Sequence, residues 1–310
     1  MVDDAERLLV RIDALLQRVE QYLPARHIEP DWSRFIAYRW RREAAMWGRP
    51  GTLLGVTHPH LIRFADLKDI DEQKARIEAN TRQFVIGRTA NNVLLTGARG
   101  TGKSSLVKAS LQAFAKHGLR LIEVDRADMV DLPEIADLIA DRPERFIIFS
   151  DDLSFEANDP GYKALKSVLD GGISATNENL LVYATSNRRH LMPEKMSENL
   201  ETKHTGNGEI HPGETTEEKI SLSERFGLWL SFYPFDQQQY LDIVTHWVSV
   251  LGGKRVAMGA DALPNEIKMA ALLWALERGS RSGRVAYQFA RDWVGVHSAS
   301  RVTVRRSRKK

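Results

Sequence analysis

Hydrophobic and polar positions change their spacing along the chain, and the changes divide it into parts. In residues 4–23 apolar side chains recur every three or four positions, which predicts an amphipathic helix. From residue 92 onward short apolar runs alternate with helical patterns, and after residue 235 only helical patterns remain. The predicted parts are an N-terminal helical extension over 1–63, an α/β domain over 64–235, a helical lid domain over 236–297 and a disordered basic tail over 298–310.

Five short apolar runs in the middle of the chain are the predicted strands. Their separation by helical segments is typical of a parallel sheet covered by helices on both faces. The runs are Val93–Thr96, Leu119–Val124, Arg145–Ser150, Leu180–Thr185 and Leu228–Phe232. Predicted helices of the lid follow at Asp236–Leu251, Asn265–Glu277 and Gly283–Val294. Because ligands of such sheets bind at the carboxyl ends of the strands, the residues that follow each run are the candidates for chemistry.

Residues 31–42 mix aromatic side chains with arginines. Such a mixture suits base stacking on a nucleic acid. It also suits a peripheral helix whose aromatic side chains pack on the main body while the arginine stems extend to water. The second arrangement is the commoner one, and the sequence leaves both open.

The loop after the first run reads GARGTGKS and fits the pattern G-x-x-x-x-G-K-[ST] between a strand and a helix. In such a loop the backbone N–H groups converge on a phosphate, and the helix that follows adds the positive end of its dipole. Lys103 is expected to reach the β- and γ-phosphates, and the Ser104 hydroxyl to ligate Mg²⁺. The predicted binding residues of this nucleoside triphosphate site are Gly97, Ala98, Arg99, Gly100, Thr101, Gly102, Lys103, Ser104 and Ser105.

Polar side chains end the third and fourth runs. Asp151 and Asp152 close FIIFSDD, so Asp151 is the candidate Mg²⁺ ligand and Asp152 the candidate general base for an attacking water. Asn187 follows the next run, where an amide can hydrogen-bond the γ-phosphate or the water. The expected metal ligands are therefore Ser104 and Asp151.

Two arginines complete the set of candidate site residues. Arg225 stands immediately before the fifth run, which places it far from its own phosphate loop and makes it a candidate arginine finger for a neighbouring subunit. Arg284 opens the last helical segment, from which its guanidinium could fold back over the phosphates. Either arginine alone is typical of a surface ion pair, and only the order of all the motifs makes the two arginines candidates for the site.

In this order the motifs resemble those of the AAA+ ATPase superfamily: Walker A, Walker B, sensor 1, arginine finger and sensor 2. The resemblance covers about residues 64–294, and residues 66–71 resemble the superfamily's segment that closes over adenine. Stretches such as RFIIFSDDLSFE and EEKISLSERFGLWLSF look like a bacterial AAA+ family of unknown function. The resemblance implies ATP as the nucleotide, hydrolysis to ADP and phosphate, and self-association into a ring or spiral.

Two features depart from common AAA+ patterns. Many members carry Asp-Glu where this chain has Asp151-Asp152, so the base is one methylene shorter, and Glu156 is a more distant substitute. Threading unfoldases also carry an aromatic-glycine pair in the region that is RADMVDLP here, over residues 126–133. The absence of that pair disfavours polypeptide threading.

Composition adds limits on location and partners. The chain has no cysteine, no run of 18 apolar residues and no basic, apolar start typical of a signal peptide, so we expect a cytoplasmic protein with no membrane contact. Six of the last ten side chains are basic, although the formal net charge is only +3. The tail is therefore either a solubilising end or an arm for nucleic acid.

Three functions remain open after these observations. The leading hypothesis is an oligomeric remodelling or loading ATPase that acts on an unidentified macromolecule. The second is a nucleotide switch that binds ATP and scarcely hydrolyses it. The third is a small-molecule kinase, which the sensor asparagine, the position of Arg225 and the helical lid disfavour.

Overall fold

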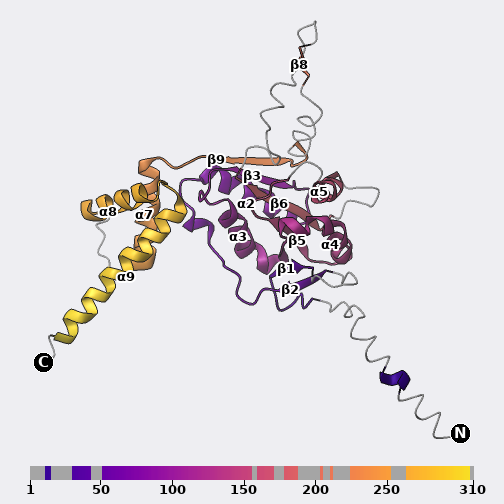
Figure 1. Ribbon diagram of the computed structural model, residues 1–310, viewed down its shortest axis with the longest axis horizontal. Coiled ribbons are helices and arrows are strands. Elements are labelled where there is room, and N and C mark those ends of the chain that lie inside the picture. The colour runs from indigo at the N-terminus through magenta and orange to yellow at the C-terminus, as the bar shows by residue number, and fades with distance from the viewer. Residues whose placement is uncertain are drawn as a thin grey trace.

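Figure 1 shows the chain as a computed structural model. It describes residues 11–14, 30–42, 51–155, 159–170, 178–187, 203–204, 210–211, 224–252 and 263–307. Of the predicted helix over 4–23, residues 11–14 are helical, and the rest lies outside the described residues, as Glu156 does.

The centre of the fold is a seven-stranded sheet in the order β2-β1-β4-β5-β6-β3-β9. The five predicted strands are confirmed, and they pair in parallel with one another. Their bounds are β3 Val93–Gly97, β4 Leu119–Glu123, β5 Arg145–Ser150, β6 Leu180–Ser186 and β9 Leu228–Phe232. Strand β3 lies between β6 and β9, so the phosphate loop that follows it emerges from the interior of the sheet.

Two further strands extend this sheet, and they correct the expectation of a purely helical N-terminal part. Strand β1 (Ala37–Arg41) pairs in parallel with β4, and β2 (Thr52–Gly55) pairs antiparallel with β1. In β1 the side chains alternate, so that Trp40 is fully buried and donates to Asp131 at 2.9 Å while Arg39 binds Glu123 at 2.6 Å. The mixture of aromatics and arginines thus reflects the two-residue period of a strand.

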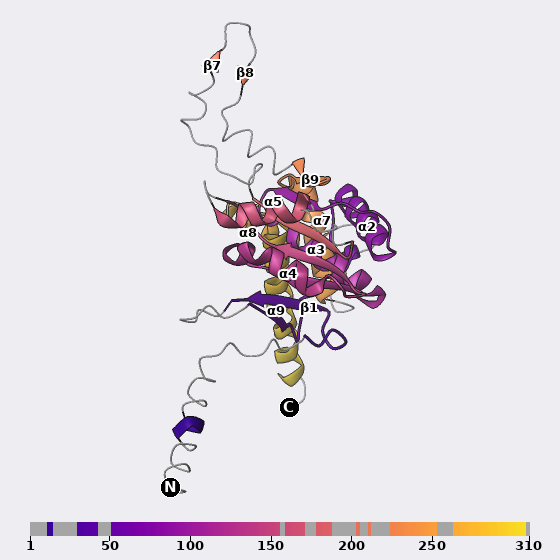
Figure 2. The same cartoon turned by 90° about the vertical axis from the view of Figure 1, so that its right-hand side faces the viewer.

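Helices cover both faces of the sheet, as the nearly continuous burial along β3, β5 and β6 requires. Leu95 of β3 belongs to one core cluster with α2 (Asp71–Val85) and α3 (Lys103–Phe114). Leu94, its neighbour, belongs to a second cluster with α4 (Leu132–Ile139) and α5 (Pro160–Asp170). Figure 2 shows α2 and α5 on opposite sides of the strands. Short 3₁₀ turns complete this part of the chain at η1 Phe64–Asp66, η2 Ala115–His117 and η3 Arg126–Asp131.

Three helices, in the segment predicted to be a lid, lie beside the end of the sheet from which the phosphate loop emerges (Figure 1). They are α7 Gln237–Gly252, α8 Asn265–Glu277 and α9 Gly283–Ser307. The Tyr240 hydroxyl of α7 donates to the Ala271 carbonyl of α8 at 3.0 Å, and Trp247 packs edge-on against Tyr287 of α9. Helix α9 continues through residue 307, whereas the sequence predicted a disordered tail from 298.

A separate two-stranded sheet joins β7 (Lys203–His204) and β8 (Ile210–His211). It lies in the polar stretch between β6 and β9. Within the part of the chain that the structure describes, no helix is both long and apolar enough to cross a membrane.

Candidate functional site

The loop between β3 and α3 depends on three glycines in the left-handed region of backbone space. Gly97, Gly100 and Gly102 have φ values of 125°, 74° and 102°. A Cβ atom at Gly97 would lie 1.9 Å from the Phe232 carbonyl oxygen of β9, so no other residue fits there without moving the sheet. The pattern of glycines that the sequence motif prescribes therefore has a steric cause in this fold.

Lys103 folds back into this loop. Its Nζ atom donates to the carbonyl oxygens of Gly97 and Ala98, each at 2.8 Å, and to Asn187 Oδ1 at 3.0 Å. The side chain is buried, and this burial lowers the pKa of Lys103, while Asp151 and Asp152 act in the opposite direction. An ammonium group held by neutral oxygens is ready to exchange them for a charged ligand.

Both candidate acids lie beside the loop and are tied to it. Ser104 donates through Oγ to Asp151 Oδ1 at 2.6 Å, so the two predicted metal ligands are in direct contact. Asn187 donates through Nδ2 to Asp152 Oδ1 at 2.5 Å, while its Oδ1 accepts from Lys103. The side-chain amide of Asn187 therefore bridges the ammonium group of Lys103 and the carboxylate of Asp152, the candidate base.

The pairing of β5 with β6 brings these groups together. Ser150 is in register with Ala184, so the residues that follow each of them meet at the carboxyl edge of the sheet. Asp152 has a φ of 54°, a left-handed conformation that aspartate tolerates better than most residues. Its backbone N–H donates to Thr185 Oγ1 at 2.9 Å. Thr185 was not among the predicted site residues, because its contact with Asp152 depends on the register of β5 with β6.

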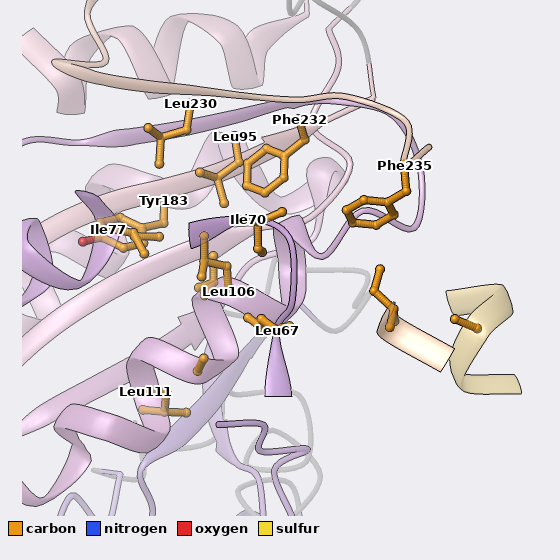
Figure 3. Packing of buried hydrophobic residues seen from close by; sticks show 14 of the residues in the cluster. Leu67, Ile70, Ile77, Leu95, Leu106, Leu111, Tyr183, Leu230, Phe232 and Phe235 are labelled. Atoms are coloured by element: carbon orange, nitrogen blue, oxygen red, sulfur yellow. The ribbon is translucent and has the colours of Figure 1, made fainter. Parts of the chain in front are cut away.

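The segment expected to close over adenine lies against the same loop. A Cβ atom at Gly102 would stand 3.4 Å from Ile70 Cδ1 and 3.9 Å from Leu67 Cδ2. Figure 3 shows Leu67 and Ile70 beside Leu106 of α3. Apolar side chains therefore border the loop on the side where α3 begins.

Asp66 links this segment to the lid. Its carboxylate accepts from Arg63 at 2.7 Å, and the Arg63 hydrogen bond holds the pKa of Asp66 below its usual value. His246 of α7 places Nε2 3.4 Å from the same carboxylate. Burial lowers the pKa of His246, with Lys68 acting in the same direction.

The start of α9 also touches the loop. A Cβ atom at Gly100 would lie 2.8 Å from Ser282 Cβ, and one at Gly283 would lie 3.2 Å from the Gly100 carbonyl oxygen. Arg284 is exposed on this contact, and its charge adds to the lowering of the Lys103 pKa. The start of α9 thus places Arg284 beside the loop.

The remaining predicted residues occupy different surroundings. Arg99 is exposed on the loop, and Thr101 donates to the Ala98 carbonyl at 2.8 Å, while Ser105 lies half-buried in the first turn of α3. Arg225 precedes β9 at the amino edge of the sheet, and its Nε donates to Asp170 Oδ1 at 2.5 Å. The structure therefore assembles every predicted site residue except Arg225 around one loop.

The residues at the carboxyl edge fit a small divalent cation bound together with phosphate. Ser104 and Asp151 offer oxygen atoms, which Mg²⁺ prefers, and they supply only two side chains. No group of three or more His, Cys, Asp or Glu side chains suited to a metal exists among the described residues. A cation at this site would therefore complete its coordination with water and phosphate oxygens.

The fold and the arrangement of these motifs define an AAA+-like P-loop protein. The chain belongs to the family described as "Protein of unknown function (DUF815)", which matches residues 33–297. Among curated proteins, none matches the chain.

Solved structures with a similar fold share little sequence with the chain. One mutant form of Thermotoga maritima RuvB is 14% identical, with a TM-score of 0.50, over 76% of this chain and 66% of that one. Aeropyrum pernix Orc1 in complex with DNA is 18% identical, with a TM-score of 0.49, over 76% and 61%. Caenorhabditis elegans PCH-2 is 13% identical, with a TM-score of 0.43, over 76% and 72%. At these identities the likeness is one of fold, and the chain spans about two thirds of the RuvB chain.

Proposed function

We propose that the chain binds ATP with Mg²⁺ and hydrolyses it to ADP and phosphate. The observation that carries the proposal is the linked set of side chains at one edge of the sheet. Lys103, Asn187 and Asp152 form one hydrogen-bonded chain there, beside the Ser104–Asp151 pair. Groups of these types can bind phosphate, activate a water molecule and ligate a metal, and here they lie beside one loop.

Binding would use the loop as the structure presents it. The N–H groups at the start of α3 face the phosphates, and Lys103 exchanges the carbonyl oxygens of Gly97 and Ala98 for phosphate oxygens. Ser104 and Asp151, which bind each other in this structure, would be the two side chains that hold Mg²⁺. When bound, Mg²⁺ would offset negative charge on the phosphate oxygens.

Hydrolysis would depend on the bridge made by Asn187. Asp152 accepts the proton of the attacking water, and the Asn187 amide keeps its carboxylate at a fixed distance from Lys103. Arg284 stands on the lid beside the loop, where its guanidinium adds positive charge next to the phosphates.

Self-association would complete the site. Arg225 lies at the amino edge of the sheet, whereas the loop lies at the carboxyl edge, so it serves a neighbouring subunit better than its own. A head-to-tail contact of this kind closes into a ring or continues as a spiral. Such assemblies use the hydrolysis cycle to change contacts with a macromolecule, and we propose remodelling or loading of such a partner.

A nucleotide switch is the second candidate, and one observation favours it. The candidate base is the shorter aspartate, and its carboxylate already accepts a hydrogen bond from Asn187 at 2.5 Å. A protein whose base is engaged in this way hydrolyses ATP slowly unless the nucleotide or a second subunit breaks the hydrogen bond to the base.

The experiment compares Lys103→Ala with Lys116→Ala, an exposed lysine at the end of the same helical segment. ATP binding is measured by calorimetry with and without Mg²⁺, and phosphate release is measured at saturating ATP. We expect wild-type protein and Lys116→Ala to bind ATP and release phosphate, and Lys103→Ala to do neither. Binding without phosphate release would favour the switch, and transfer of phosphate to a small acceptor would favour a kinase. Unchanged ATP affinity in folded Lys103→Ala would overturn the proposal.

A further inference from the structure

Thr185 makes an unusual set of contacts with the residues that end β5. Its hydroxyl donates to Asp151 Oδ1 at 2.6 Å and accepts from the backbone N–H of Asp152 at 2.9 Å. Its carbonyl oxygen accepts from the N–H of Leu153 at 2.7 Å. One residue of β6 therefore holds three consecutive residues after β5.

The single proton of the Thr185 hydroxyl is used in the contact with Asp151. A hydroxyl has one proton to donate, and here the proton goes to the Asp151 carboxylate. The side chain is 1% exposed, so water does not replace either partner. Asp151 Oδ1 also accepts from Ser104, so the carboxylate oxygen is fixed between two hydroxyls.

The second contact of Thr185 concerns the backbone of the candidate base. Asp152 has a φ of 54°, a conformation that is uncommon for a residue with a Cβ atom. Such a conformation persists where surrounding contacts hold it, and the hydrogen bond from Asp152 N to Thr185 is one such contact. The same turn directs the Asp152 carboxylate to Asn187.

We propose that Thr185 is a positioning residue that aims the metal ligand and the base at the same time. Through Asp151 it orients the carboxylate next to Ser104, and through the N–H of Asp152 it fixes the turn that carries the base. This inference rests on the proposed function, because Thr185 would orient the residue that binds Mg²⁺ and the residue that accepts the proton of water in that reaction. Residues that orient metal ligands typically contribute about 10- to 100-fold to metal affinity or activity.

Two matched pairs of full-length variants separate the hydroxyl from the packing. Thr185→Val keeps the size of the side chain and removes the hydroxyl, so it is compared with wild type. Thr185→Ala and Thr185→Ser both lose the methyl group and differ only in the hydroxyl. If the valine variant does not fold, the alanine and serine variants decide the question.

The first readout is hydrogen exchange of the Asp152 amide in protein without nucleotide. We expect exchange to be about fivefold faster in Thr185→Val than in wild type, and in Thr185→Ala than in Thr185→Ser, because the N–H loses its acceptor. This readout needs neither ATP nor Mg²⁺.

The second readout is the Mg²⁺ concentration at which ATP binding becomes tight, measured by calorimetry. We expect it to rise about tenfold or more in Thr185→Val and Thr185→Ala, with ATP affinity in the presence of a chelator unchanged. Thr185→Ser should restore the wild-type Mg²⁺ dependence. If both pairs show equal exchange and equal Mg²⁺ dependence, Thr185 has no positioning role. If wild type itself shows no Mg²⁺-dependent ATP binding, the proposed function fails, and this inference fails with it.

Discussion

The two edges of the sheet use polar side chains in different ways. At the carboxyl edge they bind one another, as Ser104 binds Asp151 and Asn187 binds Asp152. At the amino edge they bind backbone carbonyls, as Asn179 donates to the carbonyls of Ile139 and Arg142 at 2.7 and 3.0 Å. The side-chain hydrogen bonds of Asn179 to the backbone stabilise the fold. At the carboxyl edge the side chains that bind one another, and Lys103 with its partners Gly97 and Ala98, can exchange these partners when a ligand arrives.

Arg225 departs from this pattern. It lies at the amino edge, but it forms an ion pair with the side chain of Asp170, and both groups are partly exposed. We therefore expect its importance to lie in function, unlike that of its neighbours at the same edge.

The largest expected effect follows from replacing Arg225 with alanine. If it acts as an arginine finger, turnover should fall by about 10³-fold while ATP affinity stays unchanged. The matched control is Arg145→Ala at the same edge, because Arg145 donates to the Glu178 carbonyl at 2.5 Å. That variant should lose stability and keep its turnover per folded protein.

Mixing two inactive variants tests whether Arg225 acts across subunits. Arg225→Ala keeps an intact phosphate loop, and Lys103→Ala keeps an intact arginine, so a mixed interface contains one complete site. We expect partial recovery of phosphate release on mixing. If subunits exchange and the mixture stays inactive, Arg225 has a structural role only.

The next largest effect concerns the candidate base at the carboxyl edge. Asp152→Asn should keep ATP binding and lower turnover by about 100-fold or more, because an amide does not accept the proton of water. Asparagine tolerates the left-handed backbone at this position, so the fold should be unaffected. Measured phosphate release near the wild-type rate, together with its loss in Glu156→Gln, would move the base to Glu156.

At the amino edge the expected effect is on stability. Asn179→Ala removes the donor that serves the carbonyls of Ile139 and Arg142, so the free energy of unfolding should fall by about 1–3 kcal/mol. Urea unfolding measures this change. Turnover per folded protein should not change, and a loss of turnover as large as that of Asp152→Asn would erase the difference between the edges.

The smallest effect lies at the contact between the lid and Asp66, away from both edges. Burial lowers the pKa of His246 in the folded chain, so below the unfolded pKa of about 6.5 the unfolded chain binds more protons. His246 therefore contributes stability above that pH, and the contribution is lost as the pH falls through the folded pKa. His246→Gln should show a smaller loss of unfolding free energy between about pH 7.5 and pH 5.5, measured by urea unfolding. If wild type and His246→Gln lose equal amounts of unfolding free energy over this pH range, His246 is not the cause of the pH dependence.

The five parallel strands were predictable from the sequence because each is a short apolar run bounded by polar residues. Strand β1 was not predictable in the same way. Its run, AYRWR, carries two arginines, and it becomes a strand only because β4, much later in the chain, offers a free edge. Arg39 then forms an ion pair with Glu123. In the sequence this arginine was consistent with a peripheral helix or a nucleic-acid-binding surface.

Most candidate site residues were predictable because their motifs are local. Gly97, Gly100 and Gly102 are required by the bends of a single loop, and Asp151 and Asn187 follow runs that must end at the same edge of a parallel sheet. Thr185 belongs to no such motif. Its importance depends on the register of β5 with β6, which a linear pattern does not specify.

The sequence by itself determined the class of the fold, the phosphate loop and the order of the polar residues after each strand, because backbone sterics and hydrophobic periodicity act over a few residues. Tertiary structure decided which of these groups touch. The contacts of Asn187 with Lys103 and Asp152, and of Thr185 with Asp151, join residues that lie 34 to 84 positions apart. These contacts depend on the register of the paired strands. The register is fixed by how apolar side chains pack on the two faces of the sheet, and those side chains come from segments far apart in the sequence.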